Sequence, residues 1–211
     1  GSFCGSDVGG YWAKKGNRSA WLPALLALGF QIIPLCPLSC FNRLAAEPVK
    51  DLRWTAPLVD EIDRQFQARA FYFTGGRYSN QWFPYRLYAP PQLDPRKKYP
   101  LLLWFHGAGE SGTDNLKNLM HVDRAVEGHL SKYGSIPAFI LVPQAPSIER
   151  GWGDRRTKHY DMLTVTSALL EQTIRENPID EDRVVISGVS SGGTACWEMA
   201  LRHPDRFAAV A

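Results

Sequence analysis

One stretch of the sequence decides the fold: Arg183-Val184-Val185-Ile186-Ser187-Gly188-Val189-Ser190-Ser191-Gly192-Gly193. Its apolar first half predicts a buried strand, and residues 191–202 predict a helix directly after it. The turn between them carries the pattern G-x-S-x-G. A serine on so sharp a turn takes strained backbone angles, and a side chain two residues before or after it would collide with the strand or the helix. Glycine stands at both places, so Ser190 is a candidate nucleophile, flanked by Gly188 and Gly192.

A second stretch joins a continuous apolar strand to a glycine-rich loop: Leu103-Trp104-Phe105-His106-Gly107-Ala108-Gly109-Glu110-Ser111-Gly112. Gly107, Gly109 and Gly112 match the pattern G-x-G-x-x-G, so a dinucleotide-binding site is one interpretation. Three features oppose it. Two predicted strands precede this stretch, whereas the dinucleotide pattern usually opens the first strand–helix–strand unit of its domain. No apolar helix begins at Gly112. The acidic residue about 20 positions further on, Glu127, does not end a strand, as the acidic residue of such a site would.

The other interpretation of this loop is an oxyanion hole, in which backbone N–H groups bind the oxygen of a substrate carbonyl as it gains negative charge. Ala108 is the best candidate for the first donor, and the N–H of Ser191, the residue after the candidate nucleophile, is the second. His106, Gly107 and Gly109 support the motif. We expect His106 to pack and form hydrogen bonds beneath the loop rather than to act as a base.

The rest of the body alternates strands and helices. Apolar periodicity predicts strands over 66–72, 82–88, 101–105, 138–142, 183–187 and 207–211, and helices over 160–177 and 191–202. A turn at Gly75-Gly76 makes the first two strands an antiparallel hairpin, and a polar helical stretch is expected to end near residue 129. This order predicts an α/β domain with a mostly parallel sheet, the hairpin at one edge and helices on both faces.

The N-terminal part has the pattern of a signal peptide. Lys14, Lys15 and Arg18 precede an apolar core over 21–30, and Leu44-Ala45-Ala46 supplies small residues for cleavage. We expect residues 1–46 to be a leader and residues 47–64 to connect this leader to a domain over residues 65–211. We expect the protein to be secreted or periplasmic. A membrane anchor and a tag-derived segment are the alternatives.

Charge and cysteine content narrow the function of the body. Residues 1–50 hold five of the 24 Lys and Arg and two of the 21 Asp and Glu, so the remaining chain is neutral, with 19 of each. The body therefore has no basic excess for nucleic acid or an anionic membrane. Of the four cysteines only Cys196 lies in it, which excludes a disulfide framework there.

Several motifs together resemble a known family. Residues 99–110 with Gly112-Thr113-Asp114-Asn115 look like the oxyanion region of α/β-hydrolases of the esterase and predicted-peptidase group related to dienelactone hydrolases. Further similar pieces are 142–146 with Trp152, 179–183, 188–193 with Trp197, and 203–209. The resemblance covers about residues 65–211 in order. It implies an α/β-hydrolase fold, hydrolysis of an ester-like acyl bond, and no metal or organic cofactor.

The family places its catalytic residues in the order Ser, acid, His. After Ser190 the chain offers only Glu198, His203 and Asp205. Glu198 lies on the helix that follows the serine, and we expect His203 and Asp205 on the far side of the sheet from Ser190. Asp154, His159 and Asp161 precede Ser190 and are interpreted as loop and helix-cap residues. We therefore expect the acid and the His beyond Ala211, a domain incomplete at its C-terminus, and a chain that is inactive by itself.

The expected substrate is a small-molecule or polysaccharide-linked ester, with Trp152 or Arg155 as a candidate contact to it. The sequence does not choose between a simple ester, a feruloyl ester and a peptide, and it gives no oligomeric state. A non-catalytic α/β-hydrolase-like binding module or remnant is the main alternative function.

Overall fold

The computed structural model describes residues 63–122, 126, 135–146, 151–153 and 161–211. The predicted leader, nearly all of the predicted connecting segment, and the residues Asp154, Arg155 and His159 lie outside these ranges. Among the helices of the described ranges, none has the length and apolar character needed to cross a membrane.

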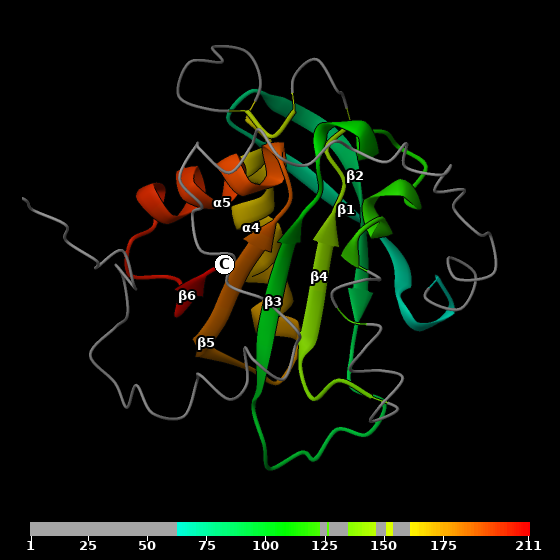
Figure 1. Ribbon diagram of the computed structural model, residues 1–211, viewed down its shortest axis with the longest axis vertical. Coiled ribbons are helices and arrows are strands. Elements are labelled where there is room, and N and C mark those ends of the chain that lie inside the picture. Colours follow the sequence, from blue (N-terminus) through cyan, green and yellow to red (C-terminus); the bar gives the residue numbers. More distant parts are fainter. Residues whose placement is uncertain (1–62, 123–125, 127–134, 147–150, 154–160) are drawn as a thin grey trace, which may run out of the picture.

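A six-stranded sheet forms the centre of the molecule (Figure 1). Its strands are β1 (Gln67–Gly75), β2 (Tyr78–Tyr88), β3 (Tyr99–Phe105), β4 (Phe139–Pro143), β5 (Ile179–Gly188) and β6 (Ala209–Val210), in the order β1-β2-β4-β3-β5-β6. The β1–β2 and β2–β4 pairs are antiparallel, and the other pairs are parallel. The predicted hairpin and the mostly parallel sheet are therefore confirmed.

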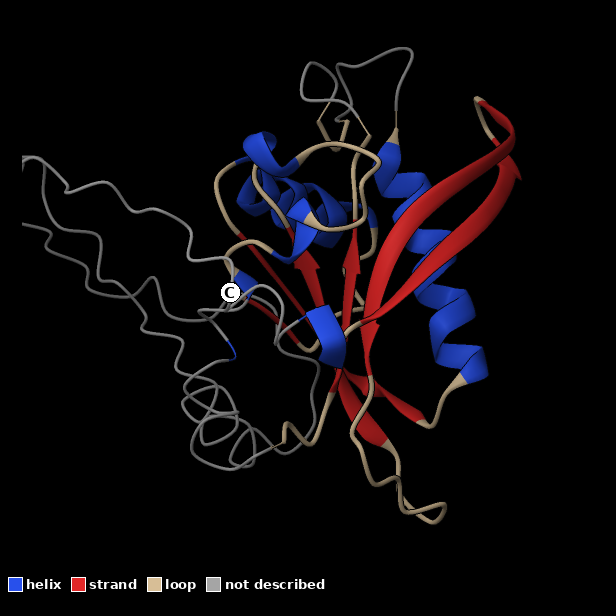
Figure 2. Ribbon diagram, turned by 90° about the vertical axis from the view of Figure 1, so that its right-hand side faces the viewer, coloured by secondary structure: helices blue, strands red, loops and turns tan. Residues whose placement is uncertain are grey.

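Alternate residues of β3 face two apolar layers. Leu101, Leu103 and Phe105 pack in the cluster that contains the buried side chains of α4 (Met162–Glu176) and α5 (Ser191–Arg202). Leu102 and Trp104 belong to the cluster on the other face, with the apolar side chains of Leu119, Val122 and Val126. Figure 2 shows the sheet between these layers, with α4 on the right and short helical turns on the left. The continuous apolar run of β3 is thus buried on both faces.

The chain after β3 begins with two three-residue 3-10 turns, η3 (Ala108–Glu110) and η4 (Lys117–Leu119). Val122 and Val126, which lie in the stretch predicted to be helical up to about residue 129, are helical. Asp114 Oδ1 accepts hydrogen bonds from the N–H groups of residues 116 and 117, both at 2.8 Å. Such a side-chain turn competes with continuous helix, as do the glycines before it.

Five of the six strands differ in length from their predictions: β1, β2, β3 and β5 are longer, and β6 is shorter. Strand β5 begins at Ile179, where it pairs with Tyr99, and the register shifts before Leu101 pairs with Val184. The acidic residues between these pairs hid the start of the strand. Strand β6 has two residues, whereas the apolar run predicted five.

The N-terminus of α5 lies directly on the end of β3. Val189 N–H donates to the Phe105 carbonyl at 3.1 Å. A Cβ on Gly188 would lie 2.6 Å from that oxygen, and a Cβ on Gly192 would lie 2.7 Å from the His106 carbonyl oxygen. Both distances are shorter than atoms tolerate, so the close approach requires glycine at both positions.

We predict that Gly192→Ala lowers the free energy of unfolding by about 3 kcal/mol or prevents folding, because the new methyl would overlap fixed backbone. Gly109→Ala is the matched control, since a Cβ there meets nothing within 4 Å; we expect it to change the free energy of unfolding by about 0.5 kcal/mol or less. Urea unfolding measures both. Equal effects of the two substitutions would contradict this account of the turn.

Asp161 ties the start of α4 to the end of α5. Its carboxylate accepts from Thr164 N–H at 3.2 Å, which caps α4, and from Arg202 Nη1 at 2.7 and 2.9 Å. Its own N–H donates to the Tyr78 hydroxyl at 3.0 Å. Burial raises the pKa of Asp161, but the hydrogen bonds from Thr164 and Arg202 outweigh burial and hold that pKa below its ordinary value.

Asp161→Ala should lower the free energy of unfolding by about 1–2 kcal/mol near neutral pH, through loss of the cap and the ion pair. Because the folded pKa is lowered, the stabilisation is complete above the ordinary carboxyl pKa and is lost as the pH falls through the folded value. Unfolding curves across that range should show the gap between wild type and variant narrowing in acid. Asp161→Asn, which keeps a capping oxygen, should lower the free energy of unfolding by less than Asp161→Ala does. A difference between wild type and Asp161→Ala that does not change with pH would contradict the role of the Asp161 carboxylate.

Candidate active site

Ser190 lies on the turn between β5 and α5 in a strained conformation. Its φ is 55° and its ψ is −117°, a left-handed φ in a residue that has a side chain. The residue is exposed, and it is the N-cap of α5. A conformation of this kind costs on the order of 1–3 kcal/mol and persists where the surrounding structure fixes it. The turn therefore presents the Ser190 hydroxyl above the carboxyl ends of the parallel strands.

Two helix starts meet near Ser190. Ser191 is the first residue of α5 and Ala108 the first residue of η3, and the first N–H groups of a helix have no partner inside it. Within η3 the internal hydrogen bonds come from Glu110 N–H and Ser111 N–H, both at 3.3 Å. A Cβ on Gly107, the residue before η3, would lie 3.6 Å from the Ser190 Cβ. The structure thus brings the glycine-rich loop against the candidate nucleophile.

His106 is fully buried beneath this loop. Its Nε2 accepts a hydrogen bond from Ala145 N–H at 3.0 Å, so its Nδ1 carries the proton and donates to the Gly107 carbonyl at 2.6 Å. Burial lowers the pKa of His106, which favours this neutral form. Because both ring nitrogens are engaged by the backbone, His106 is not free to take a proton from Ser190.

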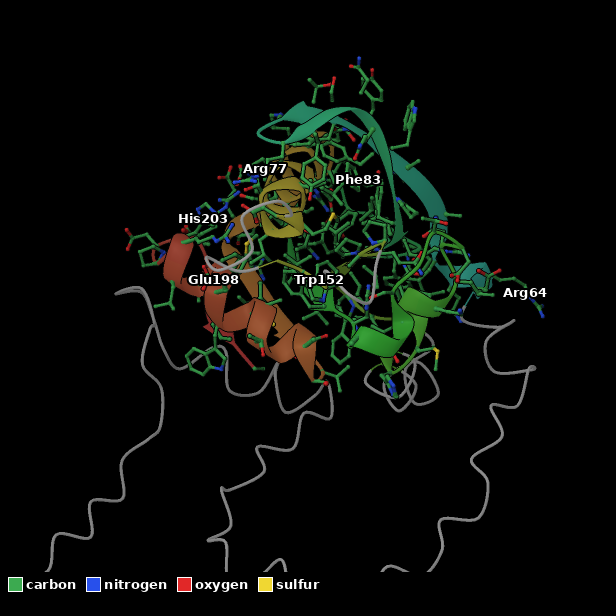
Figure 3. All side chains as sticks on the ribbon, turned by 90° about the horizontal axis from the view of Figure 1, so that it is seen from above. Arg64, Arg77, Phe83, Trp152, Glu198 and His203 are labelled. Atoms are coloured by element: carbon green, nitrogen blue, oxygen red, sulfur yellow. The ribbon has the colours of Figure 1, made fainter. Side chains whose placement is uncertain are left out.

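Trp152 lies under the same loop. Its indole is buried, Nε1 donates to the His106 carbonyl at 2.9 Å, and the ring lies 4.8 Å from the ring of Phe105 in an edge-to-face contact. Figure 3 shows Trp152 in the middle of the molecule, seen from the carboxyl ends of the strands. The structure gives Trp152 a role in supporting the loop, while a contact with substrate stays a prediction.

The loop also has partners that sequence reasoning missed. Gln144 follows β4 and is fully buried, and its carboxamide contacts Glu110, Asp114 and Asn115. The signal for it was a single polar residue after five apolar residues at the carboxyl end of a buried strand. Burial raises the pKa of Asp114, but hydrogen bonds from Lys117 and Leu116 N–H and from Gln144 outweigh burial and lower it.

A buried carboxylate lies on the inner side of the loop. Glu110 is 8% exposed, and its Oε1 lies 3.6 Å from His121 Nε2. Its other oxygen would be 2.7 Å from a Cβ on Gly107. A negative charge therefore lies near the loop that we expect to bind an oxyanion, with the His121 imidazole beside it.

Glu198 and His203, which follow Ser190, lie away from it. Glu198 accepts from Arg202 at 3.1 Å, and His203 ends α5 with its Nε2 3.4 Å from the Ser167 hydroxyl. A helix of this length spans about 18 Å, and Ser190 lies at its other end. Figure 3 shows Glu198 and His203 toward the outer end of α5, remote from Trp152. Asp161, which precedes Ser190, caps α4.

Two features of the site bear on which cofactors it could hold: the shape of the glycine-rich loop and the spacing of residues that could bind a metal ion. A dinucleotide site uses the N-terminus of a long helix after its glycine-rich turn, whereas Gly107, Gly109 and Gly112 lie in and around the three-residue turn η3. Among the described residues, no group of three or more His, Cys, Asp and Glu side chains is close enough to hold a metal ion.

Comparison with known proteins identifies the family. A family model described as "Putative esterase" matches residues 78–211. A thermostable esterase of known structure is 30% identical, with a TM-score of 0.58 over 70% of this chain and 40% of that one. A ferulic acid esterase is 20% identical (TM-score 0.51, 69% and 59% covered).

A further solved structure is a fluorophosphonate-binding serine hydrolase from Staphylococcus aureus. It is 14% identical, with a TM-score of 0.50 and coverage of 69% of this chain and 55% of that one. The chain thus spans 40% to 59% of the length of these three proteins. Since the family model covers well over half of the chain, the protein belongs to this esterase family, and its sheet has the α/β-hydrolase fold.

Proposed function

We propose that this protein is a serine hydrolase of carboxylic esters in which Ser190 is the nucleophile. The observation that carries the proposal is the strained backbone of Ser190, with φ 55° and ψ −117°, at the junction of β5 and α5. Strain of this kind collects at functional sites because it aims a side chain that an ordinary turn would leave lying along the surface. Membership of the esterase family supports the same reaction.

In the proposed mechanism the Ser190 hydroxyl attacks the carbonyl carbon of the ester and the carbonyl oxygen becomes an oxyanion. The N–H groups of Ala108 and Ser191 donate hydrogen bonds to that oxygen. The tetrahedral intermediate then collapses and expels the alcohol, leaving an acyl group on Ser190, which water removes in a second addition and elimination. The positive end of the α5 dipole favours both anionic intermediates.

A base must take the proton of Ser190 and return it to the leaving alcohol. Among the described residues we assign this role to none. Both nitrogens of His106 already bond the backbone, and His203 lies at the far end of α5. The third described histidine, His121, has its Nε2 3.6 Å from Glu110 Oε1. The proposed substrates are small esters and polysaccharide-linked esters, the classes expected from the sequence.

We predict that a fluorophosphonate labels the full-length protein and that Ser190→Ala in that protein abolishes the labelling. Ester hydrolysis should fall by about 10⁶-fold in the variant, because the attacking oxygen is lost. The label should be found by mass spectrometry on the peptide that contains Ser190. Ser167→Ala on α4 is the matched control and should be labelled like the wild type.

Two outcomes would contradict the proposal. A label that persists in Ser190→Ala would identify another nucleophile. A well-folded full-length protein that is never labelled would favour the alternative of a hydrolase-like module that binds without catalysis.

A further inference from the structure

A buried carboxamide connects the end of β4 to the loop that follows β3. Gln144 is fully buried, and a buried amide is costly unless its polar atoms find partners. Its Oε1 accepts from Asn115 N–H at 2.7 Å, and its Nε2 donates to the Glu110 carbonyl and to Asp114 Oδ1, each at 3.1 Å. Both donors and the acceptor oxygen are therefore used within this one loop.

The next residue provides a second connection. Ala145 N–H donates to His106 Nε2 at 3.0 Å, and the Ala145 carbonyl accepts from Gly112 N–H at 2.9 Å. Gln144 is itself held from β2, since its N–H donates to the Pro84 carbonyl at 3.0 Å. Two consecutive residues at the end of β4 thus fix the loop at His106, at Glu110 and over residues 112–115.

The fixed segment includes η3, whose first residue is Ala108. Its C-terminal residue, Glu110, is the one whose carbonyl Gln144 binds. At the other end of η3, a Cβ on Gly107 would lie 3.6 Å from the Ser190 Cβ. Because η3 has only three residues, a shift at Glu110 moves the Ala108 N–H relative to Ser190.

We propose that Gln144 is a positioning residue for the oxyanion hole: its carboxamide holds η3 so that the Ala108 N–H faces the oxygen bound at Ser190. The inference rests on the proposed function, because it assigns Gln144 a task in the same site. A hydrogen bond to an oxyanion depends steeply on distance, and a misplacement of about 1 Å costs on the order of 10²-fold in rate. The neutral imidazole of His106 holds the other end of the loop, through its hydrogen bonds with Ala145 N–H and the Gly107 carbonyl.

Gln144→Met tests the proposal, since methionine has a similar length and shape but makes none of the three hydrogen bonds. In the full-length protein we expect hydrogen exchange of the amides at 107–119 to rise at least about tenfold, while α4 keeps its protection. The rate of fluorophosphonate labelling should fall about 100-fold. With an ester substrate, kcat and kcat/KM should fall together and KM should change little.

Thr173→Val is the matched control. Thr173 is buried, and its hydroxyl donates to the Leu169 carbonyl within α4 at 2.8 Å. This variant loses a buried hydrogen bond away from the loop, so it should lose stability without changing loop exchange or labelling. If Gln144→Met does not fold, Gln144→Asn, which shortens the side chain by one methylene and keeps the carboxamide, should give a smaller change of the same kind.

The outcomes separate the two proposals. Loop exchange in Gln144→Met that stays at the level of Thr173→Val would overturn the positioning role, as would labelling that falls only in proportion to the unfolded fraction. A full-length protein that is never labelled would remove the serine-hydrolase proposal, while the exchange measurement would still decide whether Gln144 holds the loop.

Discussion

The backbone carbonyl of Phe105 is the point on which the site depends. It ends β3 and accepts the hydrogen bond of Val189 N–H at 3.1 Å, so the central strand is bonded directly to the turn that carries Ser190. A Cβ on Gly188 would lie 2.6 Å from this oxygen, and a Cβ on Gly192 would overlap it. The position of Ser190 is therefore set by backbone packing against backbone, which side chains at these two positions would prevent.

The strain at Ser190 needs support from both sides of the turn. On one side, β5 lies between β3 and β6 and cannot shift without breaking two sets of strand hydrogen bonds. On the other side, the buried face of α5 packs in the main core, and the ion pair of Arg202 with Asp161 holds its far end to α4. The strain at Ser190 costs about 1–3 kcal/mol. This cost is small beside the free energy of the strand hydrogen bonds and core packing that hold β5 and α5, so the turn keeps its unfavourable backbone angles.

The sequence predicted the parts of the molecule that rest on periodicity and on local sterics. Strand β3 is continuously apolar because both its faces are buried, and α5 begins directly after the G-x-S-x-G turn, so both could be located from the chain alone. The sheet followed from the alternation of elements. The α/β-hydrolase fold and the esterase family were predicted from sequence motifs, among them the G-x-S-x-G turn itself.

What the sequence did not predict depends on contacts between distant residues. The hydrogen bonds of Gln144 join positions about 30 residues apart, and no pattern of apolar residues reports them. The 3-10 turns η3 and η4 are too short for a periodic signal. Strand β6 has two residues although the apolar run is longer; Ala209 and Val210 are the residues in register with β5. The predicted leader lies outside the described residues and stays a prediction.

Buried polarity in this fold is concentrated beneath the oxyanion loop. Five of the eight buried polar or charged residues in the described ranges lie in that loop or bond it: Arg86, His106, Glu110, Asn118 and Gln144. An apolar core excludes such groups unless they find partners, as Arg86, His106 and Gln144 do here, and hydrogen bonds made in one arrangement only resist any other. The buried polar groups therefore fix the oxyanion loop, as the close packing at glycine fixes the turn that carries Ser190. The loop and the turn lie on two sides of the space above Ser190, and they approach each other at Gly107.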